Sequence, residues 1–143
     1  MNIINQDITE IDFGVIVSQV NCQGVMGSGL AKTIKDKYPQ VFEGYINFIE
    51  KFKYRLQFGH KWNTEVLLGE INPVKITKDL YMVNLFGQNY YGYDGKRYTS
   101  YAAWERALPK LKIFVDKVNL PVYFPYNVAS DRANGNFIII SEM

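Results

Sequence analysis

The feature that most constrains the fold is a glycine-rich stretch between an apolar run and a lysine-bearing run. Residues 14–20 (GVIVSQV) are short, apolar and rich in β-branched side chains, which predicts a buried strand. Residues 24–29 contain three glycines, and residues 30–38 then predict a short helix that Pro39 ends. The order of strand, glycine loop and helix is typical of a site that holds an anion at the start of a helix.

Two further helices are predicted from the spacing of apolar side chains. Residues 39–56 carry apolar side chains three and four positions apart, which predicts a helix with one apolar face. Residues 100–118 repeat the pattern. Thr99 or Ser100 is expected to cap this second helix, and Pro109 inside it is expected to bend it.

Helices and strands therefore alternate along the chain. The remaining predicted strands are residues 65–76, 80–86 and 120–128. The first of them is expected to enter a turn at Asn72-Pro73. This alternation predicts an α/β domain with a largely parallel sheet covered on both faces. Ligands of such sheets bind at the carboxyl ends of strands, so residues 21–29 and 127–136 are the candidate ligand loops.

Length, charge and cysteine content exclude several classes of protein. The 143 residues suit one domain spanning 1–143. The net charge of +2 is too small to indicate nucleic-acid binding, and the single cysteine excludes an internal disulfide. No signal peptide is visible, and no apolar stretch approaches the ~20 residues that would span a membrane. We predict a soluble, cytoplasmic, monomeric protein with no cofactor and no metal.

Two familiar phosphate-binding loops do not fit the glycine stretch. A P-loop requires a lysine directly after its last glycine, and here Leu30 follows Gly29. A dinucleotide-binding loop requires G-x-G-x-x-G, and Lys32 takes the place of the third glycine. The type that remains is a loop whose backbone N–H groups wrap a diphosphate without any lysine. The start of the following helix would add a favourable field for that anion.

Four segments of the chain resemble the macrodomain family, in the family's order and over nearly the whole chain. Residues 20–39 resemble its first signature, most closely in the small branch of ADP-ribose 1''-phosphate phosphatases and related ADP-ribosyl-ester hydrolases. The other matching segments are residues 6–9, residues 83–88 with 96–108, and residues 122–137. The resemblance implies a single three-layer α/β/α domain with a mixed, largely parallel sheet.

The resemblance also implies an ADP-ribose site at the top of the sheet. Asp7 would receive the adenine amino group beside the backbone of Ile8, unless Asp7 merely caps a turn before Thr9. Asn21 matches an asparagine that lies near the distal ribose in relatives. Its amide can donate to a ribose hydroxyl or orient a water. The alternative is a loop asparagine that satisfies its own backbone.

The first loop would line the distal ribose and the diphosphate, mostly through backbone N–H groups. Its expected ligand-binding residues are Gly24, Val25, Met26, Gly27, Ser28 and Gly29. Val25 and Met26 would supply apolar walls. Cys22 is expected to be a packing residue rather than a nucleophile, because the only histidine, His60, lies beyond a helix.

The second loop departs from the glycine-rich run of relatives. Its expected ligand-binding residues are Val128, Ala129, Ser130, Asp131, Arg132 and Phe137. Ala129 and Asp131 stand where glycines are usual, and a carboxylate facing a diphosphate would weaken binding. Arg132 could offset that charge or hold a terminal phosphate. Asp131 could instead act as a general base or nucleophile, and Phe137 could pack near the adenine or in the core.

These departures leave the function divided between two main hypotheses. Relatives in this branch often carry a histidine where this chain has Gln19, and some use a lysine where it has Phe86-Gly87. The resemblance implies a hydrolase of ADP-ribose 1''-phosphate or of an ADP-ribosyl ester, with Asn21 and Asp131 as candidate catalytic residues. The alternative is a binding module that holds ADP-ribose, ADP-ribosylated protein or a related nucleotide without cleaving it. A protein that keeps the fold and binds none of these ligands is the third hypothesis.

Overall fold

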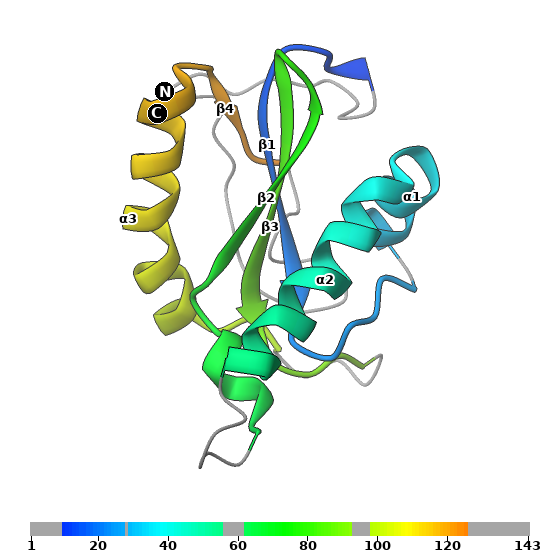
Figure 1. Cartoon of the computed structure of the whole chain (residues 1–143), viewed down its shortest axis with the longest axis vertical. Coiled ribbons are helices and arrows are strands. Elements are labelled where there is room, and N and C mark those ends of the chain that lie inside the picture. Colours follow the sequence, from blue (N-terminus) through cyan, green and yellow to red (C-terminus); the bar gives the residue numbers. More distant parts are fainter. Residues whose placement is uncertain (1–9, 28, 56–61, 93–97, 126–143) are drawn as a thin grey trace.

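The computed structural model describes residues 10–27, 29–55, 62–92 and 98–125. In this part of the chain, one mixed sheet lies between two layers of helices (Figure 1). The strands are β1 (Gly14–Asn21), β2 (Ile71–Thr77), β3 (Leu80–Gln88) and β4 (Val122–Tyr123). The helices are α1 (Gly29–Lys37), α2 (Pro39–Arg55) and α3 (Tyr101–Val118), with a short 3₁₀ helix, η2, at Thr64–Leu67.

The sheet has the order β2-β3-β1-β4 among the described strands. Strand β1 runs parallel to both β3 and β4, and β2 runs antiparallel to β3. Helix α3 covers one face of the sheet, and α1 and α2 lie on the other (Figure 1). The predicted three-layer α/β/α domain with a mixed, largely parallel sheet is therefore confirmed.

Strand β1 is buried on both faces because its apolar side chains alternate between the two helix layers. Val15 and Val17 pack in the cluster under α3. Ile16 and Val20 point the other way and pack in the cluster under α1 and α2. A strand that is apolar on both faces is expected in the centre of a covered sheet. The predicted strand at residues 14–20 is confirmed.

The helix boundaries follow local signals in the sequence. Helix α2 begins at Pro39, since the fixed φ of proline suits a first helical turn. The side chain of Ser100 caps α3 by accepting a hydrogen bond from the backbone N–H of Ala103 over 3.1 Å. Thr99, the other predicted cap, instead forms a β-bridge with Gln88.

The structure differs from two predictions about strands. Asn72 and Pro73 lie inside β2 rather than in a turn, and residues 65–67 of the expected strand belong to the 3₁₀ helix η2. Strand β2 is at an edge of the described sheet, where a proline is tolerated because one side of the backbone has no ladder partner. Within the described part of the strand expected at residues 120–128, which ends at Pro125, only Val122–Tyr123 form a strand, β4. Pro121 and Pro125 flank β4, and neither has an N–H to donate to a ladder.

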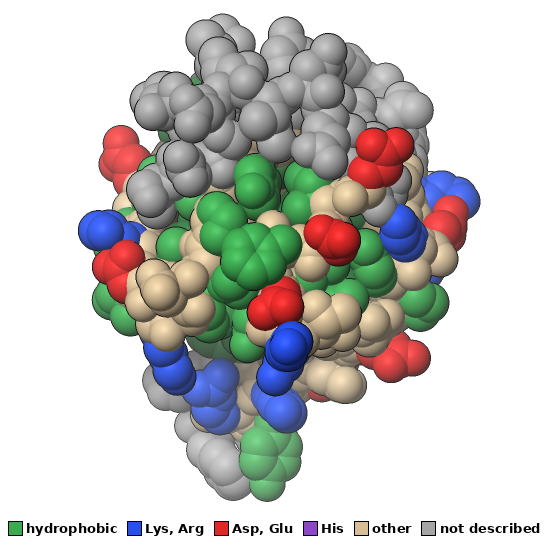
Figure 2. All heavy atoms as spheres, turned by 90° about the horizontal axis from the view of Figure 1, so that it is seen from above, with side chains coloured by type: hydrophobic (Ala, Val, Ile, Leu, Met, Phe, Trp, Pro, Cys, Tyr) green, Lys and Arg blue, Asp and Glu red, His purple; other side chains and the backbone are tan. Residues whose placement is uncertain are grey.

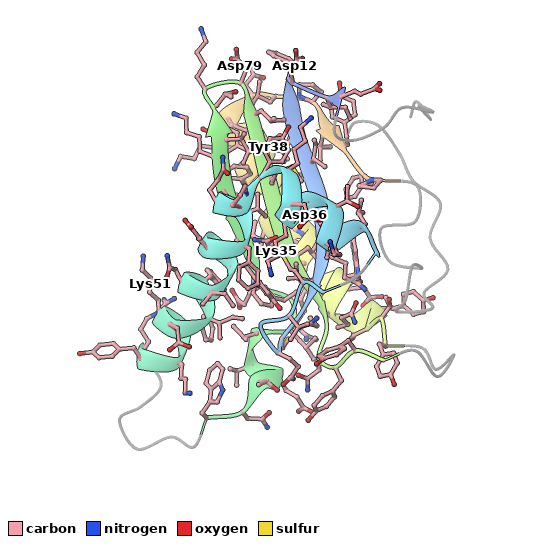
Figure 3. All side chains as sticks on the ribbon, turned by 90° about the vertical axis from the view of Figure 1, so that its right-hand side faces the viewer. Asp12, Lys35, Asp36, Tyr38, Lys51 and Asp79 are labelled. Carbon is pink, nitrogen blue, oxygen red and sulfur yellow. The ribbon has the colours of Figure 1, made fainter. Side chains whose placement is uncertain are left out.

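The two ends of the sheet carry different parts of the chain. The β1–α1 loop and the end of β3 share the carboxyl end of the two parallel strands. Asp12 and Asp79 lie at the opposite end (Figure 3). Seen from that end, acidic and basic side chains are scattered around hydrophobic side chains at the centre of the face (Figure 2). No helix in the described ranges is long and apolar enough to cross a membrane.

Candidate functional site

The β1–α1 loop is folded around the side chain of Asn21, the last residue of β1. Its side-chain oxygen accepts a hydrogen bond from the backbone N–H of Gln23 over 2.9 Å. Its Nδ2 donates to the carbonyl of Val25 over 2.8 Å. Asn21 is buried, so the amide shapes the loop from inside. This is the alternative role that the sequence left open, and contact between Asn21 and a ligand stays a prediction.

Tyr45 of α2 contacts the same loop from the core of the protein. Its ring is fully buried, and its hydroxyl lies against both oxygens of Asn21, 2.8 Å from the side-chain Oδ1. The hydroxyl also accepts a hydrogen bond from the backbone N–H of Gly24 over 3.0 Å. Gly24 has a φ of 80°, in the left-handed region that favours glycine. Burial raises the pKa of Tyr45, so the hydroxyl stays protonated.

Beyond Gly24, one side of the loop is buried against the core and the other side is open to solvent. The Met26 side chain belongs to the core under α1 and α2, and Val25 is half-buried. Gly27 is exposed, and a Cβ placed there would meet only Val25, at 3.6 Å. No described residue accepts a hydrogen bond from the backbone N–H of Met26 or Gly27. These groups and the open space beside Gly27 form the candidate anion site.

Helix α1 starts at Gly29, directly after this open side. Its first turn carries no acidic residue, so nothing there opposes an anion at the positive end of the helix dipole. Lys32 does not reach back to the loop, because it pairs with Asp36 along the exposed side of the helix at 2.7 Å. The prediction of a loop that would hold an anion without a lysine is consistent with this pairing.

Cys22 is part of the packed core under α1 and α2. Burial, with a smaller contribution from the negative charge of Glu65, raises the pKa of the Cys22 thiol to about 12. A thiol that stays protonated is a poor nucleophile. The structure agrees with the expectation that Cys22 is a packing residue.

Gln19 lies in a buried polar network that the sequence did not predict. Its Nε2 donates to Gln88 Oε1 over 2.8 Å and to Thr99 Oγ1 over 3.0 Å. Its Oε1 accepts from the indole N–H of Trp104 over 2.6 Å. Both N–H bonds of the amide are used, and an amide does not titrate. Gln19 therefore joins β1, β3 and α3 and offers no acid or base. The available signal was a polar residue inside an apolar strand.

A second network ties the loop to the end of β3. Gln23 Nε2 lies 3.0 Å from both the carbonyl and the side-chain oxygen of Asn89. Thr64 Oγ1 donates to Asn89 Oδ1 over 2.7 Å. The backbone N–H of Cys22 donates to the Asn89 carbonyl over 3.1 Å. Sequence reasoning missed this cluster, because its members come from three separate segments.

Among the described residues, the structure places Asn21, Gly24, Val25, Met26, Gly27 and Gly29 of the predicted site in the β1–α1 loop and at its two ends. The other predicted residues, Asp7, Ile8, Ser28, Val128, Ala129, Ser130, Asp131, Arg132 and Phe137, lie outside the described residues, as does His60. Phe86 is buried in the core. Among the described residues, no group of three or more histidine, cysteine, aspartate or glutamate side chains could hold a metal ion.

Comparison with known proteins identifies the fold. No protein-family model matches the chain, and no curated protein matches its sequence. The macrodomain of DarG from Mycobacterium tuberculosis superimposes with a TM-score of 0.67 and 20% identity, over 92% of this chain and 78% of that one. The chain has the macrodomain fold. The resemblance of its sequence motifs to macrodomains is confirmed at this level.

Two more solved structures share this macrodomain fold. One is a protein of unknown function from Bacteroides thetaiotaomicron, with a TM-score of 0.69 and 23% identity over 90% of this chain and 76% of that one. The other is DarTG from Thermosipho africanus, solved in complex with ADP-ribose. It matches with a TM-score of 0.58 and 16% identity, over 86% of this chain and 31% of that one.

Proposed function

We propose that this chain binds ADP-ribose and that the β1–α1 loop holds the diphosphate. The observation that carries the proposal is the open, exposed position of Gly27, next to backbone N–H groups with no described acceptor. Such a loop followed by a helix start favours an anion. The macrodomain fold adds support, because one protein with this fold has been solved with ADP-ribose.

The sequence resemblance supplies the rest of the proposed binding mode. The second N–H of the Asn21 amide, which donates to no described acceptor, would donate to the distal ribose. Asp7 would receive the adenine amino group, and residues 128–132 with Phe137 would close the site over the ligand. Free ADP-ribose, its 1''-phosphate and ADP-ribosylated protein are the expected partners.

We further propose hydrolysis of ADP-ribose 1''-phosphate or of an ADP-ribosyl ester. Asp131 would act as general base or nucleophile, and Arg132 would hold the terminal phosphate. The support is the resemblance to the phosphatase branch of macrodomains. Phosphate release from ADP-ribose 1''-phosphate tests the first activity, and release of ADP-ribose from an ADP-ribosylated carboxylate tests the second. Asp131→Asn should abolish release, whereas Asp79→Asn, at the opposite end of the sheet, should leave it unchanged.

A binding module without catalysis is the second candidate, and one observation favours it. The buried groups that the structure places at the first loop do not titrate near neutral pH: the Gln19 amide is neutral and fully bonded, and the Cys22 thiol stays protonated. Binding of ADP-ribose in the micromolar range, at about −8 kcal/mol, with neither phosphate release nor cleavage of an ADP-ribosyl ester above a buffer control, would establish this candidate. Release that depends on Asp131 would exclude it.

A further inference from the structure

The Tyr45 hydroxyl is a polar contact between helix α2 and the glycine loop. It accepts the Gly24 N–H at 3.0 Å and lies against both oxygens of Asn21. A hydroxyl has one proton, so it donates to one of the two Asn21 oxygens at a time. A single side-chain atom thus joins α2 to the end of β1 and to the first glycine of the loop.

The ring that carries this hydroxyl has little freedom to move. It is fully buried, with its centroid 5.6 Å from that of Phe86 and 6.2 Å from that of Phe42. Aromatic pairs at such distances favour particular mutual orientations, which restricts how the Tyr45 ring can turn. A tyrosine hydroxyl is protonated at physiological pH, and burial raises the pKa of Tyr45 further, so the donor is always present there.

The Tyr45 contact holds the loop at Gly24, where the backbone adopts a conformation that favours glycine. Gly24 has a left-handed φ of 80°, and its N–H points to Tyr45 rather than to the open side of the loop. The Asn21 side chain holds the next turn through Val25. Together these contacts determine which amides are engaged inside the protein and which, at Met26 and Gly27, have no described acceptor.

We propose that Tyr45 is the positioning residue of the anion-binding loop, and that its hydroxyl holds the loop in the binding conformation before ligand arrives. Tyr45 touches the loop and not the ligand. Its effect on affinity rests on the proposed function, whereas its effect on loop conformation does not. Preorganisation of this kind raises affinity by removing the cost of ordering the loop on binding.

The test compares Tyr45→Phe with Tyr81→Phe. Tyr45→Phe keeps the ring and removes only the hydroxyl. Tyr81 packs against Phe114 on the α3 side of the sheet and serves as the matched control. Hydrogen exchange of backbone amides is measured without ligand, and ADP-ribose affinity is measured by calorimetry. In Tyr45→Phe, the hydrogen-bonded amides of residues 22–25 should exchange about tenfold faster or more, and ADP-ribose should bind about tenfold more weakly.

The pattern of exchange separates positioning from general stability. A purely structural role would speed exchange equally in the loop and in the interior of β1, and that result would overturn the proposal. Unchanged exchange in the loop, or faster exchange with unchanged affinity, would also overturn it. If the unsubstituted protein binds no ADP-ribose, the proposed function fails, and the exchange data alone decide whether Tyr45 positions the loop.

Discussion

The indole N–H of Trp104 donates a 2.6 Å hydrogen bond to the side-chain oxygen of Gln19, joining α3 to β1 at the carboxyl end of the sheet. The two residues are 85 positions apart in the sequence. Both are buried, so the bond is made away from solvent. The end of β1, from which the glycine loop departs, is therefore held by a polar contact as well as by apolar packing.

Trp104→Phe should lower the free energy of unfolding by about 1–3 kcal/mol, because it leaves the Gln19 oxygen buried without its donor. Urea unfolding followed by circular dichroism measures the loss. Trp62→Phe is the matched control, since Trp62 is only half-buried and packs at the edge of the other cluster. Equal losses in the two variants would contradict the role given to the Trp104 bond.

Gly87→Ala should destabilise the protein by about 1–3 kcal/mol, because the site is overpacked by a single methyl group. A Cβ at Gly87 would fall 2.5 Å from Trp104 Nε1 and closer still to the Gln19 oxygen. Gly27→Ala, with only Val25 within reach, should leave the melting temperature nearly unchanged. Equal melting temperatures for the two alanine variants would contradict the prediction, because they would mean that the side chains around Gly87 make room for a methyl group.

Gly27→Glu should abolish ADP-ribose binding while the protein stays folded. The position is exposed, has open space and lacks a left-handed φ, so the backbone accepts a side chain. The added carboxylate would repel the diphosphate. Ile113→Glu, on the exposed side of α3, adds the same charge away from the loop and should bind as the unsubstituted protein does. Retained binding in Gly27→Glu would contradict the proposal that this loop holds the diphosphate.

Stability should fall as the pH rises from about 9 toward 12. Burial raises the pKa of Cys22 from 9.0 to about 12, so the unfolded chain releases the thiol proton first and gains stability relative to the folded state. The raised pKa of Tyr45 acts in the same direction. Urea unfolding at several pH values should show a shallower decline in Cys22→Ala. A decline of the same steepness in that variant would contradict the assignment to the thiol.

The fold was predictable where the pattern is local. The strand at β1, the glycine loop and helix α1 follow from apolar alternation, glycine spacing and Pro39 within one continuous stretch. The turn expected at Asn72-Pro73 was wrong, because a dipeptide that usually marks a turn also fits an edge strand. Which strand lies at the edge is a property of the whole sheet.

The candidate site was predictable only in part, for the same physical reason. The position of Asn21 at the end of β1 follows from the local pattern. Tyr45 is one apolar-face residue among several in α2, and its contact with Gly24 spans 21 positions. The bonds of Gln19 to Gln88 and Thr99 span 69 and 80 positions. Contacts of this range depend on how helices pack on the sheet, which periodicity does not specify.

The most direct test follows the backbone amide resonances of ¹⁵N-labelled protein during titration with ADP-ribose, since backbone amides are the groups proposed to hold the diphosphate. The account predicts that the largest shifts fall in residues 24–29 and saturate with a dissociation constant in the micromolar range. Shifts centred elsewhere, or no shift up to about 1 mM ligand, would contradict it.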